Sequence, residues 1–241
     1  MKALLLAAGE GTRLRPLTER LPKPMIPIAG KPILEHNVNF LARWGIREIA
    51  MNLHHCPEVV INHFGDGSGF GVDITYSYEP ELLGTAGTVK KLERFFEGTF
   101  LVIYSDNLID IDLNRLLLFH HEHQGIATIV LHYRDDVSQS GVAALDGHDR
   151  ITNFIEKPKP GLAISHWVNA GVLVLERDVL KYIPCSTPSD FGREIFPSLL
   201  KQKKRLYGYR LGEGEEIWWI DRIEDHERVQ EIFSKRLTNN E

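Results

Sequence analysis

The chain has 241 residues, of which 43% are hydrophobic and 25% charged, with a net charge of −5 and two cysteines. This length and apolar fraction fit one α/β domain with a buried core, so we expect a single domain over residues 1–241. The charge argues against a general nucleic-acid binder, and two cysteines cannot form a disulfide framework. No apolar run reaches the roughly 20 residues of a membrane span. We therefore expect a cytoplasmic protein that binds neither nucleic acid nor membranes.

Short apolar runs alternate with helical patterns, which predicts βα units around a mostly parallel sheet. In the first half, strands are expected at 2–6, 48–52, 73–77 and 99–104, and helices at 32–44, 57–64, 88–96 and 113–123. The second half is richer in strands, expected at 127–132, 142–145, 151–156 and 168–176. A helix capped by Ser189 or Asp190 is expected to reach Leu200, and a last helix to run from Glu224 to about Arg236.

The first expected strand runs into a glycine-spaced turn, Gly9-Glu10-Gly11-Thr12-Arg13. Because glycine has no Cβ, Gly9 and Gly11 let backbone N–H groups approach an anion closely. Thr12 adds a hydroxyl donor and Arg13 a forked cation, and Lys23 follows ten residues later with a second positive charge. The turn therefore predicts a polyphosphate-binding loop at the end of a strand.

Two other phosphate-binding patterns do not fit this turn. The dinucleotide fingerprint needs a third glycine where the chain has Leu14. The ATPase-type loop needs Gly-Lys-Ser/Thr, whereas the chain has Gly11-Thr12-Arg13. A dehydrogenase with a Rossmann domain is therefore disfavoured, and NAD(P)H binding without NTP turnover would restore it.

Two aspartates stand at the ends of apolar runs, where open α/β sheets bind ligands. Asp106 comes directly after the run 100–104 and Ser105, and Asp221 follows Trp218-Trp219-Ile220. Taken alone, each aspartate is more often a helix cap or a turn residue. Because Mg²⁺ prefers hard oxygen ligands and retains phosphate oxygens and water, the two aspartates beside a phosphate loop become candidate metal ligands.

Together these motifs resemble the sugar-1-phosphate nucleotidyltransferases, also called nucleotide-sugar pyrophosphorylases. Their pattern, Gly-x-Gly-Thr-Arg-Leu-x-Pro followed by Lys-Pro, stands here at 9–16 and Lys23-Pro24. The resemblance covers nearly the whole chain. It implies an α/β, Rossmann-like three-layer sandwich with a mixed, mostly parallel sheet (the nucleotide-diphospho-sugar transferase type), without the β-helix domain that many relatives append. It also implies transfer of a nucleotidyl group from an NTP to a sugar 1-phosphate, with Mg²⁺ as cofactor and a homodimer as the assembly.

The resemblance assigns roles residue by residue. Arg13, Lys23 and Asp106 are expected to be catalytic, and Asp106 and Asp221 to bind the metal. The expected nucleotide-binding residues are Ala8, Gly9, Gly11, Thr12, Arg13, Glu79, Gly84 and Thr85. The expected sugar-phosphate-binding residues are Gly141, Glu156, Lys157 and Asn169. The chain departs from the family pattern after Asp221, where Arg222 and Ile223 lead into a loop that lacks the usual glycine and threonine.

The expected substrates are GTP and mannose 1-phosphate, because the loop Leu83-Gly84-Thr85-Ala86-Gly87 and the Ser105-Asp106 step look most like mannose-1-phosphate guanylyltransferases. Thymidylyl-, uridylyl- and cytidylyltransferases of the same superfamily share most other motifs and stay as alternatives. A catalytically weak regulatory subunit that binds nucleotide sugars is a further alternative, supported by the departure at Arg222-Ile223. His120, His121 and His123 are expected at a solvated helix end and not in a metal site.

Overall fold

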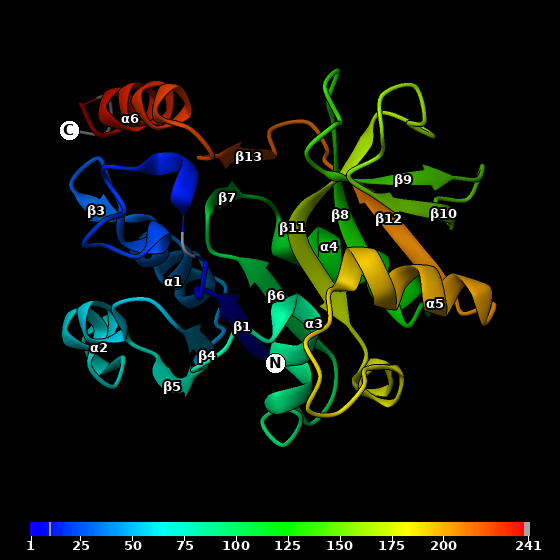
Figure 1. The fold of residues 1–241 in the computed structure, drawn as a ribbon, viewed down its shortest axis with the longest axis horizontal. Coiled ribbons are helices and arrows are strands. Elements are labelled where there is room, and N and C mark those ends of the chain that lie inside the picture. Colours follow the sequence, from blue (N-terminus) through cyan, green and yellow to red (C-terminus); the bar gives the residue numbers. More distant parts are fainter. Residues whose placement is uncertain (10, 239–241) are drawn as a thin grey trace. The chain divides into compact units, whose positions relative to one another are not determined.

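The computed structural model describes residues 1–9 and 11–238, and they form two compact units. Unit 1 contains residues 1–2, 83–103 and 111–215. Unit 2 contains residues 3–82, 104–110 and the described residues from 216 onward. Strands and helices carry the labels of Figure 1.

Unit 2 is built on three parallel strands, in which β1 (Lys2–Leu6) pairs with β4 (Glu48–Leu53) and β4 pairs with β5 (Asp73–Tyr78). Two short antiparallel pairs accompany them: β2 (Pro27–Ile28) with β3 (Lys31–Pro32), and β7 (Asn107–Asp110) with β13 (Glu216–Trp219). The helices of this unit are α1 (Ile33–Arg43), α2 (Pro57–Phe64) and α6 (Ile223–Thr238). Single 3-10 turns lie at Thr12–Leu14, Lys23–Met25 and Ser68–Phe70.

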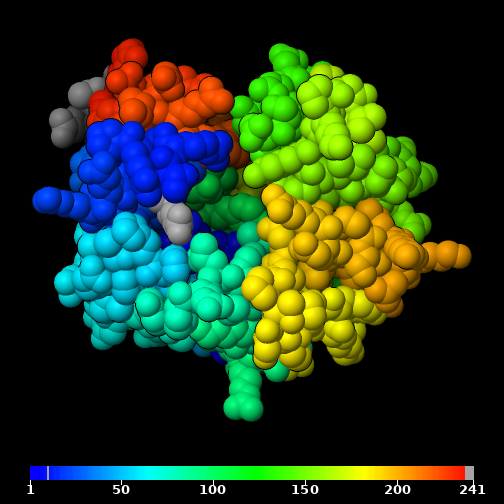
Figure 2. Space-filling model, in the orientation of Figure 1, coloured from blue at the N-terminus to red at the C-terminus, as the bar shows by residue number. Residues whose placement is uncertain are grey.

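One apolar cluster in unit 2 joins segments that are remote in the sequence. Its buried members are Leu14, Ile26, Ile28, Ile33, Leu108, Trp218, Ile220 and Val229. Leu14 directly follows the glycine-spaced turn, Leu108 follows Asp106, and Ile220 precedes Asp221, so burying these side chains together brings the candidate site residues to one place. Figure 2 shows the outer surface of this region, where α6 (red) lies against the N-terminal segment (blue).

Unit 1 has a mixed sheet centred on one long strand, β11 (Trp167–Leu175). β11 runs antiparallel to β6 (Phe100–Tyr104), β8 (Ala127–Tyr133) and β9 (Gly141–Leu145). β10 (Ile151–Glu156) is antiparallel to β9, and β12 (Leu206–Arg210) is parallel to β8. The helices are α3 (Gly84–Lys91), α4 (Leu113–His123) and α5 (Phe196–Lys201), with a 3-10 segment at Arg177–Tyr182 and a π-helical turn at Phe191–Ile195.

Two helices differ from the sequence prediction for reasons that lie outside their own segments. α3 begins at Gly84 and ends at Lys91, whereas a helix over 88–96 was expected. Its early start is stabilised by the carbonyl of Ser189, which accepts hydrogen bonds from Ala86 N and Gly87 N. The helix capped by Asp190 begins as the π-helical turn before it becomes α5. Strands β2, β3, β7, β12 and β13 were not expected.

Within residues 1–9 and 11–238, none of the helices combines the length and the apolar character needed to cross a bilayer.

Candidate functional site

The glycine loop of unit 2 folds directly onto Lys23. Gly11 has a φ of +63°, which favours glycine, and a Cβ built there would lie 2.7 Å from the Cβ of Lys23. The loop is closed by the Thr18 hydroxyl, which donates to Gly11 O over 2.8 Å. At its start, Ala7 N donates to Asn52 Oδ1 over 2.8 Å. Glu10 of the motif lies outside the described residues.

Lys23 is 5% exposed and lies between the two candidate metal ligands. Its Nζ donates to Asp106 Oδ2 over 2.8 Å and to Asp221 Oδ1 over 3.0 Å. Arg13 Nη2 donates to the same oxygen of Asp221, also over 3.0 Å. Burial opposes the charge of Lys23, but the two carboxylates outweigh it, and the pKa of Lys23 is raised above its ordinary value. Four residues expected to be catalytic or metal-binding therefore meet within unit 2.

Local backbone contacts bring the two aspartates to this position. Ser105 N donates to Leu6 O over 3.1 Å, which ties the residue before Asp106 to the end of β1. On the other side, the Asp225 carboxylate accepts hydrogen bonds from Asp221 N and Arg222 N, over 3.2 and 3.1 Å. The loop after Asp221 therefore has its own stabilising contacts, although it lacks the family's glycine and threonine.

The carboxylate oxygens that surround Lys23 Nζ are of the kind that binds a magnesium ion. Two carboxylates from remote segments, Asp106 and Asp221, both lie within 3.0 Å of one atom, Lys23 Nζ. Among the described residues, no group of three or more His, Cys, Asp or Glu side chains could hold a metal ion. Mg²⁺ at phosphoryl-transfer sites commonly uses one or two carboxylates and takes its other ligands from substrate phosphates and water. A pair of hard oxygen ligands beside the glycine loop meets that requirement.

Glu79, expected in nucleotide binding, is 1% exposed and belongs to the same unit. Asn52 Nδ2 donates to Glu79 Oε1 over 3.1 Å, and His54 Nδ1 lies 2.7 Å from Glu79 O. Because Asn52 also accepts the hydrogen bond from Ala7 N, it links Glu79 to the start of the glycine loop. Sequence analysis missed Asn52, although its place at the end of a strand next to β1 was a usable signal.

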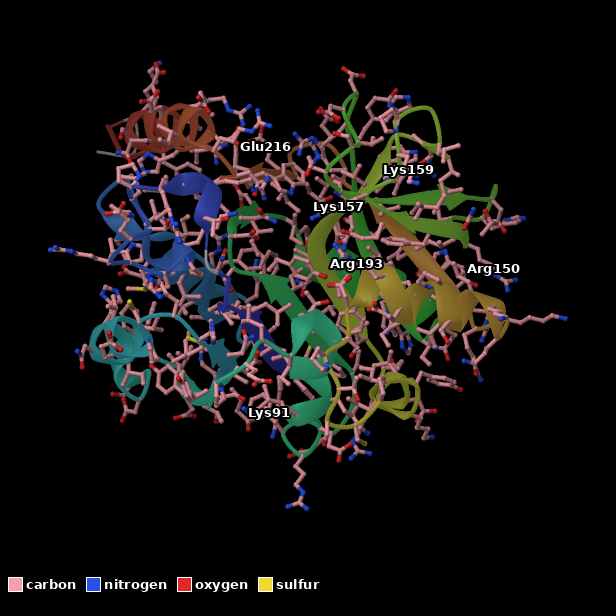
Figure 3. All side chains as sticks on the ribbon, viewed as in Figure 1. Lys91, Arg150, Lys157, Lys159, Arg193 and Glu216 are labelled. Atoms are coloured by element: carbon pink, nitrogen blue, oxygen red, sulfur yellow. The ribbon has the colours of Figure 1, made fainter. Side chains whose placement is uncertain are left out.

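In unit 1, the carboxylate of Glu156 lies against two glycines. A Cβ on Gly141 would lie 2.6 Å from Glu156 Oε2, and a Cβ on Gly192 would overlap the same oxygen. The pKa of Glu156 is raised, first by burial and then by the charge of Asp190, while Lys157 and Arg193 act in the opposite direction. Figure 3 labels these two cations, Lys157 after β10 and Arg193 in the π-helical turn.

The segment that contains Gly192 also contacts Gly84 and Thr85, both expected to bind nucleotide. Gly84 has a φ of +74°, and a Cβ there would lie 2.5 Å from Ser189 O. Thr85 Oγ1 donates to Asp190 Oδ2 over 2.8 Å and accepts from Phe191 N over 2.9 Å. The Thr85 hydroxyl is therefore used within the protein. Asp190 was expected only as a helix cap, and the sequence analysis did not predict its hydrogen bond with Thr85.

Two further residues of unit 1 complete the expected set. Asn169 lies in β11, and its Oδ1 accepts a hydrogen bond from Gly171 N over 3.0 Å. Lys157 is exposed and has a φ of +48°, and its backbone N donates to Ser140 O over 3.1 Å. The structure thus places Gly141, Glu156 and Lys157 on adjoining ends of β9 and β10.

The expectation that His120 lies at a solvated helix end is wrong. Its side chain is buried, with Nδ1 2.8 Å from Thr128 Oγ1 and Nε2 3.0 Å from Glu176 Oε1. Thr99 Oγ1 donates to the same carboxylate oxygen over 2.8 Å. These partners come from other strands and loops, so the helical pattern of 113–123 could not reveal them.

The protein is thus an α/β protein in which a glycine loop folds on a buried lysine that two aspartates bind. Residues 2–221 match the family model described as nucleotidyl transferase, and the chain belongs to this family. The family inferred from the motifs is therefore confirmed.

The chain is similar to curated members of this family over most of its length. It is 36% identical to a UTP–glucose-1-phosphate uridylyltransferase of Synechocystis sp., with 99% of the chain and 65% of that protein covered. It is 38% identical to a mannose-1-phosphate guanyltransferase of Pichia angusta, with 92% of the chain and 60% of that protein covered. The chain therefore spans less than two thirds of the length of these relatives.

A solved structure is similar in fold. HddC from Yersinia pseudotuberculosis, complexed with GMP-PN, superposes with a TM-score of 0.80 at 24% identity, covering 96% of this chain and 99% of that one. This likeness concerns the fold alone, and it confirms the expected α/β class of the nucleotide-diphospho-sugar transferase type.

Proposed function

We propose that the protein transfers a nucleotidyl group from an NTP to a sugar 1-phosphate and releases pyrophosphate. The observation that carries this proposal is the buried Lys23, held between Asp106 and Asp221 beside the glycine loop. A pure nucleotide sensor has no need of a lysine, an arginine and two aspartates gathered at one point. Membership of the nucleotidyl transferase family supports the same reaction class.

The chemistry is an in-line displacement. An oxygen of the sugar 1-phosphate attacks the α-phosphorus of the NTP, a new P–O bond forms, and the bond to the β-phosphate oxygen breaks so that pyrophosphate leaves. No covalent enzyme intermediate is needed, because the sugar phosphate is itself an adequate nucleophile. Catalysis therefore rests on positioning two polyanions and on stabilising the charge that builds at the α-phosphate.

Each residue near Lys23 has a separate role in this proposal. The backbone of Ala8, Gly9 and Gly11, with the side chains of Thr12 and Arg13, would hold the β- and γ-phosphates of the leaving group. Arg13 is half exposed and paired with Asp221 in the structure, so a phosphate can replace that carboxylate as its partner. Lys23 would bridge phosphates in the transition state.

Asp106 and Asp221 would hold Mg²⁺, which fits their oxygen donors. When bound, the ion supplies charge neutralisation at the α-phosphate and orients the attacking oxygen. The two carboxylates contribute by presenting their oxygens toward one point, Lys23 Nζ, from which both lie at most 3.0 Å.

Unit 1 carries the residues proposed for the sugar and for part of the nucleotide. Glu156 and Asn169 would accept hydrogen bonds from sugar hydroxyls, Gly141 would offer its backbone, and Lys157 would bind the sugar phosphate. The exposure of Lys157 and the partly buried Glu156 carboxylate support these roles. The base would contact Gly84 and Thr85 through their backbone. In unit 2, Glu79 is a further residue proposed for nucleotide binding.

GTP and mannose 1-phosphate are our first choice of substrates. The similarity to a mannose-1-phosphate guanyltransferase of Pichia angusta supports this choice, and the similarity to a uridylyltransferase of Synechocystis sp. supports UTP and glucose 1-phosphate as the alternative pair. Thymidylyl and cytidylyl transfer complete the set to be tested.

We also propose that the protein works in the cytoplasm as a homodimer, without nucleic-acid or membrane partners. The net charge of −5 supports the first exclusion, since nucleic-acid binders are usually basic. Sedimentation velocity at micromolar concentration tests the dimer, and a single boundary at the monomer mass would contradict it.

Pyrophosphate release tests the proposed reaction. Five NTPs (GTP, UTP, dTTP, CTP and ATP) are crossed with several sugar 1-phosphates in the presence of Mg²⁺, with Asp106→Asn as the inactive control. We expect release that needs both substrates and is strongest with GTP and mannose 1-phosphate. Another preferred pair would retain the mechanism and reject the guanylyl assignment. No release with any pair, together with tight nucleotide-sugar binding, would favour a regulatory subunit.

A further inference from the structure

The two aspartates at Lys23 lie at one end of a two-stranded ribbon formed by β7 and β13. Asn107 pairs with Trp219 at that end, and Asp110 pairs with Glu216 at the other. Asp106 directly precedes β7, and Asp221 follows β13 by two residues. The ribbon therefore carries an acidic pair at each end: the near pair, Asp106 and Asp221, and the far pair, Asp110 and Glu216.

Each acidic pair is bridged by one cation. Lys23 bridges the near pair, and Arg236 of α6 bridges the far pair, with Nη1 3.3 Å from Asp110 Oδ2 and Nη2 2.7 Å from Glu216 Oε2. Like charges directly opposite each other destabilise a pair of strands, and the charge of Arg236 offsets that repulsion in the far pair. Glu216, labelled in Figure 3, is the first residue of β13, and Figure 1 shows α6 beside this strand.

Arg236 is held in place by aromatic side chains as well as by ion pairs. Its guanidinium carbon lies 4.7 Å from the ring centre of Trp218 and 5.6 Å from that of Phe233. Trp218 belongs to β13 itself and pairs with Leu108 of β7. Arg236 therefore contacts both strands of the ribbon, one through Asp110 and the other through Glu216 and Trp218.

The far end of the ribbon is also restrained by a hydrogen bond between its flanking segments, from Asp112 N to Glu215 Oε1 over 2.9 Å. A cavity of about 450 Å³ lies beside it, and Leu108, Ile109 and Asp110 line that cavity. Arg43 of α1 approaches Asp110 only to 3.7 Å. Arg236 therefore joins the side chains of Asp110 and Glu216 on the side of the ribbon that faces this cavity, beside the backbone pairing of the two strands.

We propose that Arg236 is a positioning residue that sets the affinity of the near pair for a divalent cation by holding the far pair together. Without it, Asp110 and Glu216 repel each other, the ribbon loosens, and the oxygens of Asp106 and Asp221 are no longer held toward one point. This inference rests on the proposed function, in which Asp106 and Asp221 bind the metal.

Mn²⁺ binding to the full chain, followed by electron paramagnetic resonance in the absence of substrates, tests this role. Arg236→Met retains an apolar stem against Trp218 and removes the charge, and Arg236→Lys retains the charge. We expect the Kd for Mn²⁺ to rise about tenfold in Arg236→Met, as is typical when a residue supporting a metal ligand is lost. It should rise less in Arg236→Lys. The matched control is Lys235→Met, which removes a cation from the neighbouring position of α6, where Lys235 pairs with Glu231 over 2.6 Å.

The far pair itself provides a rescue experiment. In the Asp110→Asn/Glu216→Gln background no repulsion remains to be offset, so Arg236→Met should change the Kd by less than twofold. A merely structural role predicts the opposite pattern, a lower melting temperature with unchanged Mn²⁺ affinity in the folded protein, and would overturn the inference. The rescue background also covers the case in which Arg236→Met alone folds poorly.

Asp106→Asn separates failure of this inference from failure of the proposed function. Mn²⁺ binding by the wild type but not by Asp106→Asn would support the metal assignment. If Arg236→Met then binds Mn²⁺ as the wild type does, the positioning role of Arg236 is wrong and the metal assignment stands. If wild type and Asp106→Asn give the same result, the metal assignment is wrong and the inference falls with it.

Discussion

Gly11 and Lys23 are fitted to each other: a Cβ on Gly11 would lie 2.7 Å from the Cβ of Lys23 and 2.9 Å from Thr18 Cγ2. The buried lysine can lie beneath the glycine loop only because position 11 carries no side chain. The φ of +63° at Gly11 adds a second requirement for glycine at this position. Gly11 is therefore a packing requirement of the candidate catalytic lysine.

We expect Gly11→Ala to lower turnover by about 10²-fold or more, because the new methyl group displaces Lys23 from the two carboxylates. Pyrophosphate release measures this effect. Gly45→Ala is the matched control, since Gly45 also has a left-handed φ, +77°, but open space around its Cβ position. That control should lose about 1 kcal/mol of stability and no activity. Equal losses of activity in both variants would show that backbone strain, and not the contact with Lys23, is responsible.

Lys23→Met tests the charge itself. The substitution keeps a side chain of similar length but leaves Asp106 and Asp221 without their shared cation. We expect kcat to fall by about 10²-fold or more, because a preorganised positive charge at the phosphates is lost. Lys31→Met is the control, because Lys31 is an exposed cation of the same unit that pairs with Glu35. A Lys23→Met enzyme with normal kcat would remove Lys23 from the catalytic set.

Local patterns were sufficient to predict many elements of the fold and the composition of the site near Lys23. The expected segments 2–6, 57–64, 113–123 and 151–156 coincide with β1, α2, α4 and β10, since each carries a clear periodicity between turn residues. Arg13, Lys23, Asp106 and Asp221 were selected by motif, and the structure brings their side chains together.

Features that depend on long-range partners could not be predicted in this way. β7 and β13 are only four residues long, and their pairing joins segments about a hundred positions apart, so neither was predicted as a strand. α3 starts early because its first N–H groups reach Ser189 O. His120 is buried because Thr128 and Glu176 supply its partners. In each case tertiary contacts override the local preference.

The buried His120 predicts a pH dependence of stability. Burial lowers its pKa, and the hydrogen bond and charge of Glu176 oppose that effect without cancelling it, while His121 lowers it further. Since the pKa in the folded protein lies below that in the unfolded chain, His120 contributes its full stability above about pH 6.5. That contribution decreases as the pH falls toward the lower, folded-state pKa, because the unfolded chain takes up a proton that the folded protein disfavours.

Urea unfolding between pH 5 and 8 measures this dependence. We expect the free energy of unfolding of the wild type to decrease below about pH 6.5. In His120→Gln the decrease should be shallower, because the buried titrating group is gone. His148→Gln is the control, since His148 is exposed. If His120→Gln and wild type showed the same slope, other groups would account for the pH dependence.

Gly192 and Glu156 provide the test of the sugar-binding assignment in unit 1. A Cβ on Gly192 would overlap Glu156 Oε2, and Gly192 has an ordinary φ, so the requirement for glycine there is one of space alone. Gly192→Ala should therefore push the Glu156 carboxylate out of its position while leaving the backbone unstrained. We expect the KM for the sugar 1-phosphate to rise about tenfold, the typical effect of losing one hydrogen bond to a charged group, with little change in the KM for the NTP.

Gly147→Ala is the control for that measurement, because Gly147 also has an ordinary φ and open space around its Cβ position. Glu156→Gln completes the comparison: if Glu156 accepts from sugar hydroxyls, this variant and Gly192→Ala should affect the same KM. A rise confined to the KM for the NTP in either variant would move Glu156 from the sugar to the nucleotide. Because the two variants disturb one carboxylate by different means, charge in one and position in the other, agreement between them separates a direct role of Glu156 from a general loosening of the π-helical turn.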